Sequence, residues 1–225
     1  MVSLKGGLKQ IKEFIIMGGR GSTSGGATGG LSGGNIVGTE SLVSMRESKP
    51  QEVDQVLGVA RDVRDQYGVT TTDLEVATIK GGATMAYYDF SGNLAINESY
   101  FDAATMNKAY DSCVKSGFHP GRGNKTGLEA VTAHELGHRL TDVAGEKLGD
   151  GKWALDKTSN SIIAEAKSRL GAKSVDSVRS KISGYGKSSN AEAVAEAFAD
   201  VYCNGSKASK ESRTVVNILS EYLRR

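Results

Sequence analysis

The chain is poor in several residue types that mark common classes of protein. Its 225 residues include two cysteines, two prolines, one tryptophan and three histidines. The cysteines, Cys113 and Cys203, lie far apart and in no metal-binding or redox spacing. The sequence therefore does not imply a disulfide framework, and reduced, buried thiols are the expected state.

The chain also lacks a long apolar run and an excess of one charge sign. The 28 lysines and arginines nearly balance the 26 aspartates and glutamates, which argues against nucleic acid or an anionic membrane as a partner. The apolar run at 14–17 is too short for a signal-peptide core, and no run approaches the length that crosses a bilayer. We therefore expect a soluble chain in the cytoplasm of the producing cell.

Glycine is abundant, and it is concentrated near the N-terminus. About half of the residues from Gly18 to Gly38 are glycine, with serine and threonine filling most of the rest. Such a segment cannot bury enough apolar surface to offset the entropy of ordering its backbone. The sequence predicts a disordered Gly/Ser-rich arm over 1–47, with a short amphipathic helix at 4–17, and one folded domain over 48–225.

The predicted domain begins with a helix and a small sheet. Ser48 and Gln51 resemble a capping box, Pro50 suits a first helical turn, and an apolar stripe follows as far as Tyr67. Three blocks rich in strand-forming residues come next, and a Ser-Gly-Asn turn joins the last two as a hairpin. The expected strands are residues 74–79, 83–89 and 94–97.

The rest of the domain is predicted to be mostly helical. Thr126 and Glu129 fit a capping box at the start of a long helix. The order of a helix, a small sheet and then mostly helices predicts an α+β fold rather than an alternating α/β fold. The other expected helices are residues 102–116, 159–170, 175–183, 190–203 and 209–224.

The most informative motif is His134-Glu135-Leu136-Gly137-His138, which lies on that long helix. Residues four apart on a helix lie one above the other, so both imidazoles can reach one metal ion at roughly 2.0–2.1 Å. Glu135 projects from the neighbouring edge of the same face, close enough to take a proton from a metal-bound water. This H-E-x-x-H pattern is typical of zinc metalloproteases. The alternative is an ordinary helix with two hydrogen-bonded histidines.

A catalytic zinc site needs a third protein ligand, and acidic residues are the better candidates. The only other histidine, His119, lies in a Pro/Gly loop. We expect it either at the surface or beside the metal ligands, with a role at the rim of the cleft. Glu192, Glu196 and Asp200 recur every four residues and so share one face of a predicted helix. A solvated acidic stripe is the alternative. The rest of that helix is mostly apolar, which favours carboxylates that bind a cation.

The region around these carboxylates resembles a known family. Tyr185-Gly186 followed by residues 190–198 resembles the corresponding block of gluzincin metallopeptidases related to the anthrax lethal factor catalytic domain, and the clostridial Pro-Pro endopeptidases are similar. In those enzymes a tyrosine precedes the glutamate ligand by seven residues and a second glutamate follows it by four. Tyr185, Glu192 and Glu196 have this spacing. The matching segments cover about 30 of the 225 residues.

The resemblance implies a zincin-like fold and a zinc-dependent endopeptidase that acts on a protein or peptide. Glu135 would be the general base, the Tyr185 hydroxyl would contact the developing oxyanion, and Glu196 would support the ligands without binding zinc. Zincin sheets commonly bind the substrate as an extra antiparallel strand, and one arm of the 83–97 hairpin is the expected place. The zinc ligands that the resemblance implies, for one ion per chain, are His134, His138 and Glu192.

A second assignment of the third ligand also fits the sequence. In thermolysin-like enzymes the glutamate ligand is followed by an aspartate four residues later, a pattern that Glu196 and Asp200 match. The position of Tyr185 favours Glu192. The metal itself can be zinc or another divalent ion that accepts nitrogen ligands.

A second resemblance concerns the N-terminal segment. Residues 17–22 (Met-Gly-Gly-Arg-Gly-Ser) and the arm that follows resemble the linker in minor head proteins of phages and prophages, some of which carry similar His-Glu-Leu-Gly-His domains. This implies a virion-associated protein, tied by the arm to a larger assembly. Three function classes follow: a zinc endopeptidase, a virion structural or assembly protein with an inactive zincin domain, and a zinc hydrolase or toxin-like effector with another substrate.

Overall fold

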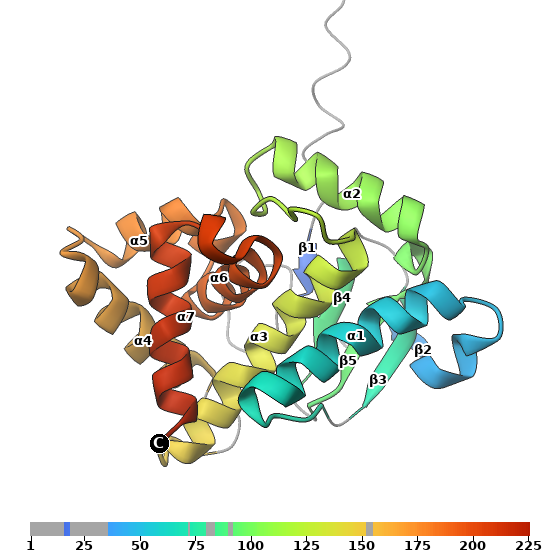
Figure 1. Cartoon of the computed structure of the whole chain (residues 1–225), viewed down its shortest axis with the longest axis horizontal. Helices are drawn as coiled ribbons and strands as arrows, with labels where there is room; N and C mark the ends of the chain where they lie inside the picture. Colours follow the sequence, from blue (N-terminus) through green and yellow to red (C-terminus); the bar gives the residue numbers. More distant parts are fainter. Residues whose placement is uncertain (1–15, 19–35, 72, 80–83, 90–91, 152–154) are drawn as a thin grey trace, which may run out of the picture.

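The computed structural model describes residues 16–18, 36–71, 73–79, 84–89, 92–151 and 155–225 (Figure 1). These residues form a mixed α+β fold in which a small sheet and a group of helices pack against a long central helix. One hydrophobic core extends from Leu42 to Leu223. The predicted α+β class is therefore confirmed. The helix predicted at 4–17 lies mostly outside the described residues, and its last two positions belong to a strand.

The first long helix is α1 (Pro50–Tyr67), and its sequence explains its limits. A proline occupies the first turn, and Gly68 ends the helix in the left-handed conformation at φ 67°. Four buried valines line one face. The predicted capping box is wrong, because Lys49 is the N-cap residue and no side chain caps the helix. The hydroxyl of Ser48 instead donates to the carbonyl oxygen of Met45 (3.2 Å).

One mixed sheet of five strands lies beneath the helices. Its strands are β1 (Ile16–Gly18), β2 (Ile36–Ser41), β3 (Leu74–Ile79), β4 (Thr84–Tyr88) and β5 (Leu94–Asn97). Their order across the sheet is β1-β4-β5-β3-β2. β4 and β5 form the predicted antiparallel hairpin, and β5 runs parallel to β3. β2 pairs antiparallel with β3, and β1 pairs parallel with β4.

The folded part begins before the predicted boundary at Ser48. β2 pairs with β3, and the 3₁₀ helix Leu42–Arg46 that follows buries its leucine in the main core at 1% exposure. The predicted arm over 1–47 is therefore wrong for residues 36–46. Most side chains of β2 are exposed, so its sequence carries no apolar pattern, although its backbone is fully part of the sheet.

The remaining helices agree with the predicted ranges to within about four residues. They are α2 (Ala103–Lys115), α3 (Gly127–Lys147), α4 (Leu155–Leu170), α5 (Val175–Ile182), α6 (Asn190–Asn204) and α7 (Lys210–Leu223). Side-chain caps define several of these starts, with Asp102 capping α2 and Ser209 capping α7. The local capping chemistry is readable from sequence, which is why these boundaries agree.

The central helix is α3, and its predicted capping box is confirmed. The Thr126 hydroxyl accepts a hydrogen bond from the backbone N–H of Glu129 (3.2 Å), and the Glu129 carboxylate accepts one from the backbone N–H of Thr126 (2.7 Å). Figure 1 shows α3 between the sheet and α1 on one side and α4, α6 and α7 on the other. Most of its residues are buried, including polar ones. Such polar residues need partners on neighbouring elements.

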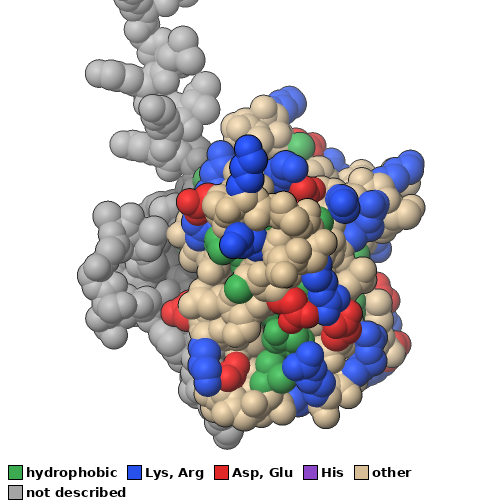
Figure 2. Space-filling view, turned by 90° about the vertical axis from the view of Figure 1, so that its left-hand side faces the viewer, with side chains coloured by type: hydrophobic (Ala, Val, Ile, Leu, Met, Phe, Trp, Pro, Cys, Tyr) green, Lys and Arg blue, Asp and Glu red, His purple; other side chains and the backbone are tan. Residues whose placement is uncertain are grey.

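The surface that includes α4 and α5 carries charges of both signs (Figure 2). Arg169 pairs with Glu165 and Glu221, and Arg179 pairs with Asp176. This face is therefore a mixed-charge surface.

In the part of the chain that the structure describes, no helix is long and apolar enough to cross a bilayer.

Both cysteines are free thiols, as the sequence indicated. Cys113 is buried, and its Sγ donates to the carbonyl oxygen of Ala109 (3.0 Å), whereas Cys203 is only half-buried. Burial raises the pKa of both thiols to about 12. Neither is therefore a thiolate near neutral pH, so neither is a candidate nucleophile.

Candidate metal centre

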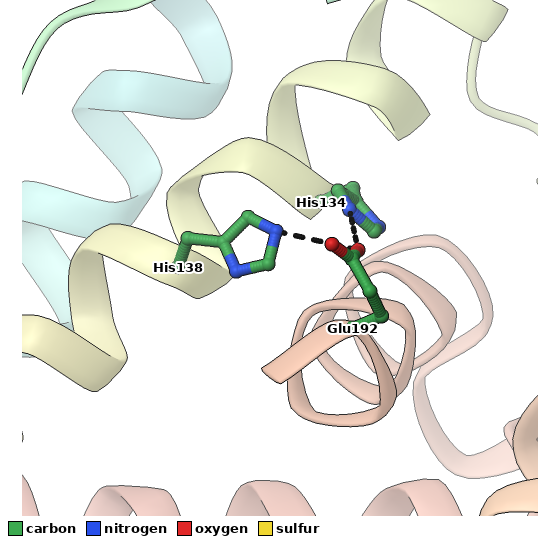
Figure 3. A group of neighbouring side chains, drawn as sticks. All are labelled: His134, His138 and Glu192. Atoms are coloured by element: carbon green, nitrogen blue, oxygen red, sulfur yellow. Dashed lines mark hydrogen bonds and ion pairs between the residues drawn. The ribbon is translucent and has the colours of Figure 1, made fainter. Parts of the chain in front are cut away.

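Two helices bring three side chains with metal-ligating atoms together (Figure 3). His134 and His138 lie one turn apart on α3, and Glu192 faces them from α6. Each offers one ligand atom, and these atoms all lie within 4.8 Å of one another. All three residues are buried, at 1%, 3% and 6% exposure. This group can hold a metal ion.

The spacing of the ligand atoms fits a tetrahedral metal. Glu192 Oε2 lies 3.1 Å from His134 Nε2 and 3.4 Å from His138 Nε2. Two ligands of tetrahedral zinc, each about 2.0–2.1 Å from the ion, lie about 3.3 Å apart. Both ring nitrogens of His138 are buried and make no hydrogen bond with a described residue, and Nε2 has only the longer ion-pair contact with Glu192. Buried polar atoms without hydrogen bonds cost free energy, so this donor set fits a cation.

A glycine within the motif lets α6 approach α3 closely. A Cβ at Gly137 would lie 2.8 Å from Ala195 Cα and 3.2 Å from Phe198 Cβ. A side chain there would force the two helices apart, because the interior is already close-packed. The glycine between Glu135 and His138 therefore sets the helix separation that puts Glu192 within reach of the histidines.

Glu196 lies one turn further along α6 and contacts the other side of a histidine ring. Its Oε1 is 2.8 Å from Nδ1 of His134, whereas Glu192 lies beside Nε2 of the same ring. A hydrogen bond at Nδ1 orients an imidazole and leaves Nε2 available to a metal. The structure therefore groups Glu192, rather than Glu196, with the two histidines, against the thermolysin-like assignment.

Asp200, the third carboxylate of the predicted acidic face, has partners elsewhere. Its Oδ2 accepts a hydrogen bond from the backbone N–H of Ser209 (3.0 Å), and its Oδ1 accepts one from Nδ2 of Asn204 (2.8 Å). These bonds hold the connection between α6 and α7. The acidic face is therefore divided between two carboxylates at the histidines and one that stabilises a turn.

The charges at the centre stabilise one another. Burial lowers the pKa of His134, but its hydrogen bonds with Glu192 and Glu196 outweigh burial and raise it to about 10. Burial acts in the opposite sense on Glu192, yet His138 and His134 hold the pKa of this carboxyl well below its usual range. The pKa of Glu196 is lowered too, because His119 and His134 outweigh burial. Both carboxylates are therefore ionised.

Glu135 is a buried carboxyl group of a different kind. It is 0% exposed, and neither of its oxygens has a hydrogen-bond partner among the described residues. Burial raises its pKa, His134 and His138 lower it in part, and the result is about 7. A carboxyl group with such a pKa can both accept and release a proton near neutral pH.

Tyr185 lies beside the same histidine. It is 8% exposed, and its ring stacks on that of His134 with centroids 5.9 Å apart and planes at 29°. Its backbone N–H donates to the carbonyl oxygen of Phe118 (2.9 Å), at the start of the 3₁₀ turn Tyr185–Lys187. Burial, and after it the carboxylate of Glu192, raises the pKa of its hydroxyl well above the ordinary value. The hydroxyl therefore keeps its proton and can donate a hydrogen bond.

His119 does not lie at the surface. It is 3% exposed, its Nδ1 lies 3.0 Å from Glu196 Oε1, and its ring stacks on Tyr110 with centroids 5.3 Å apart and planes at 9°. The prediction of an exposed or rim position was wrong because a Pro/Gly loop usually runs over the surface. Here the loop does run over the surface, but the His119 side chain lies buried between Tyr110 of α2 and Glu196 of α6. The alternative expectation, a histidine beside the ligands, agrees with its contact with Glu196.

Two further contacts at the centre had no signal in the sequence. Tyr88, at the end of β4, stacks on His138 with ring centroids 6.4 Å apart, and the ring of Phe118 lies 5.0 Å from that of Tyr185. Both aromatic residues look like ordinary core positions, and only the tertiary fold brings them to the histidines. The surroundings of the histidines are therefore defined by tertiary contacts.

Comparisons with protein-family models, with curated proteins and with solved structures gave no match for this chain.

Proposed function

We propose that this chain is a zinc-dependent endopeptidase with a zincin-like active site. Its metal ligands are His134, His138 and Glu192, which bind one Zn²⁺ per chain. The observation that carries the proposal is the grouping of these three buried side chains, with Glu135 on the same helix and without a partner among the described residues. A purely structural zinc site needs no such carboxylate, so its presence supports catalysis.

Three groups divide the chemistry of the proposed reaction. A Zn²⁺ ion held by His134, His138 and Glu192 would supply Lewis acidity that lowers the pKa of water and polarises a peptide carbonyl. Glu135 accepts a proton from the attacking water and returns it to the leaving amine. Tyr185 donates a hydrogen bond to the carbonyl oxygen as negative charge develops there. Glu196 orients His134 through its Nδ1.

A peptide is the substrate that the surroundings of the centre favour. The end of β4 lies beside the centre, because Tyr88 stacks on His138. An extended peptide binds to a strand edge through backbone hydrogen bonds, which suits substrates of varied sequence, and here it would have to displace β1 from the outer side of β4. The proposed substrate class is therefore a protein or peptide in extended conformation.

Metal content is the first test of this proposal. Elemental mass spectrometry of the dialysed chain should find about one zinc per chain. His138→Ala and Glu192→Ala should abolish tight binding, whereas Glu196→Ala should weaken it. Asp54→Ala, which removes a carboxylate that is 64% exposed on α1, is the matched control and should bind normally. Retention of zinc by the Glu192→Ala chain, with loss of zinc from the Glu196→Ala chain, would mean that Glu196 is the third ligand. A lack of zinc uptake by the unmodified chain would refute the proposed zinc centre.

Cleavage of a peptide library is the second test. The zinc-loaded chain should cleave peptides, and the Glu135→Gln chain should not. Zinc binding without any cleavage would favour the alternative, a phage or prophage virion structural or assembly protein whose zincin domain is inactive.

A further inference from the structure

A histidine that is not a metal ligand, His119, lies between α2 and α6 at the centre. Its side chain is fully buried, stacks on Tyr110 of α2, and places Nδ1 3.0 Å from Oε1 of Glu196. Its Nε2 has no hydrogen-bond partner among the described residues. Burying a polar ring in this way costs free energy, and an apolar side chain would pack there without that cost. A role beyond packing is therefore expected.

Glu196 is shared by two imidazoles. Its Oε1 lies 3.0 Å from Nδ1 of His119 and 2.8 Å from Nδ1 of His134, and its Oε2 has no hydrogen-bond partner among the described residues. A carboxylate oxygen only accepts hydrogen bonds, so both Nδ1 atoms carry a hydrogen. In the neutral ring that a metal requires, a hydrogen on Nδ1 of His134 leaves the lone pair on Nε2, which is the atom beside Glu192. His119 therefore helps to fix the carboxylate that orients a metal ligand.

The loop that carries His119 also holds Tyr185. The backbone N–H groups of Gly184 and Tyr185 donate to the carbonyl oxygens of Gly117 (2.8 Å) and Phe118 (2.9 Å). A Cβ at Gly184 would lie 2.8 Å from the oxygen of Gly117, so the two segments touch backbone to backbone. Residues 117–119 therefore contact both Glu196, whose carboxylate bonds to His134, and the segment that carries Tyr185.

We propose that His119 is a positioning residue of the metal centre. It fixes the Glu196 carboxylate, and that carboxylate holds His134 in the tautomer and orientation that direct Nε2 at the metal. The inference rests on the proposed function only in requiring a metal at His134, His138 and Glu192. It does not require that the centre cleaves peptides.

Metal affinity of the full chain tests this role. Competition with a chromophoric chelator measures the dissociation constants for Zn²⁺ and Co²⁺. His119→Phe keeps a ring against Tyr110 but cannot donate to Glu196, so we expect an affinity about 10- to 100-fold lower. His119→Gln retains a donor, so most of the affinity should return. Tyr110→Phe removes a hydroxyl without a partner among the described residues, and as the matched control it should bind metal normally.

The outcomes of this test are separable. A folded His119→Phe chain with an affinity within about twofold of the unmodified chain would overturn the positioning role, and so would a His119→Gln chain that is as weak as His119→Phe. In a Glu196→Ala background, His119→Phe should cause no further loss, because the group through which it acts is gone. Failure of the unmodified chain to bind either metal would overturn this inference and the proposed function together. Zinc binding without peptide cleavage would overturn only the peptidase.

A measurement without substitutions covers the case in which the variants do not fold. Nitrogen-15 NMR of the zinc-loaded chain, labelled at histidine, reports which ring nitrogen carries a hydrogen. We expect a hydrogen on Nδ1 of both His119 and His134. A hydrogen on Nε2 alone at His119 would overturn the inference, because that ring could not then donate to Glu196.

Discussion

At the scale of the residue, Glu135 differs from the other carboxylates of the centre. Glu192 and Glu196 each contact an imidazole, whereas the oxygens of Glu135 have no hydrogen-bond partner among the described residues. Buried carboxyl groups are almost always paired, and exceptions occur mainly at functional sites. This contrast within one centre supports the role of general base that we propose for Glu135.

Replacing Glu135 by glutamine should separate catalysis from metal binding. The amide has the same shape but is not a base, so hydrolysis should fall by at least about a hundredfold while zinc stays at about one per chain. The melting temperature should be unchanged or higher, because an unpaired buried carboxyl group is removed. Initial rates, zinc analysis and thermal unfolding measure these effects. Hydrolysis at the normal rate would contradict the peptidase mechanism.

Replacing Tyr185 by phenylalanine should lower turnover without disturbing the metal. The ring that stacks on His134 remains, and the change removes only the hydroxyl, which we propose donates to the oxyanion. One such donor is worth about 3–4 kcal/mol, so kcat should fall by about a hundredfold or more. Tyr222→Phe, which removes a hydroxyl on α7 that donates to Glu165 of α4, should retain full turnover. Equal kcat values for the two variants would exclude Tyr185 from the reaction.

At the scale of the element, the pair α3 and α6 determines the geometry of the centre. Ser189 caps α6 by accepting a hydrogen bond from the backbone N–H of Glu192 (3.1 Å), but the carboxylate of Glu192 does not return a hydrogen bond to complete a capping box. It points at the histidines of α3 instead. The Glu192 carboxylate therefore contacts the histidines of α3 instead of capping its own helix. Such a departure from the local rule is typical of a functional site.

The glycine at the α3–α6 contact should be intolerant of a methyl group. Gly137→Ala places a Cβ 2.8 Å from the backbone of Ala195, so we expect a loss of about 1–3 kcal/mol in unfolding free energy and weaker metal binding. Gly58→Ala on α1 is the control, because the nearest atom to its Cβ is the side-chain end of Arg61 at 4.0 Å. That change should stabilise the chain by about 0.5–1 kcal/mol. Denaturant unfolding measures both, and equal effects would contradict the close contact.

The outer edge of β4 is the expected place for a substrate strand, and β1 occupies it. β1 runs parallel to β4 with Ile16 opposite Thr84, whereas β5, the other arm of the hairpin, lies inside the sheet. The end of β4 at Tyr88 lies beside His138. An extended substrate that pairs with this edge would therefore compete with a segment of the chain itself.

Opening this edge should improve the binding of extended peptides. Consecutive strand residues point their N–H groups to opposite sides, so either Ile16 or Met17 faces β4, and proline at both positions removes that donor. We expect KM to fall by about threefold or more with kcat unchanged. Two prolines at Ser22 and Ser24, outside β1, form the control. An unchanged or higher KM in the β1 variant would mean that β1 does not compete with substrate.

At the scale of the whole molecule, a metal at the centre would join α3 to α6. Because α3 also contacts the sheet, α1 and α2, such a link ties together most of the core. A ligand that binds only the folded chain stabilises it by about 2.7 kcal/mol at a hundred times its dissociation constant. Metal binding and global stability should therefore be coupled.

Chelation should lower the melting temperature. For a chain of this size, about 2.7 kcal/mol corresponds to a shift of roughly 5–10 °C between zinc-saturated and chelator-treated protein. Calorimetry with and without chelator measures the shift. The Glu192→Ala chain should show no such difference, since it lacks a ligand. An equal shift in that variant would mean that zinc stabilises the chain from another site.

Much of the secondary structure was predictable because it depends on local interactions. The capping box of Thr126 and Glu129, the hairpin of β4 and β5 and the helix over 190–204 follow from residues close together in the chain. β2 was missed because its pairing with β3 joins distant segments and its exposed side chains carry no apolar pattern. The start of α1 was misplaced because Ser48 bonds to Met45 instead of capping the helix.

The sequence by itself determined that His134, Glu135 and His138 share one helical face, because their spacing acts within a single turn. It also placed Glu192 and Glu196 one turn apart on a second helix. Only the tertiary structure decided which of the two lies beside Nε2 of both histidines, since that depends on how α6 packs against α3. Tertiary packing likewise buried His119 against Glu196, because contacts between segments 77 residues apart leave no local pattern.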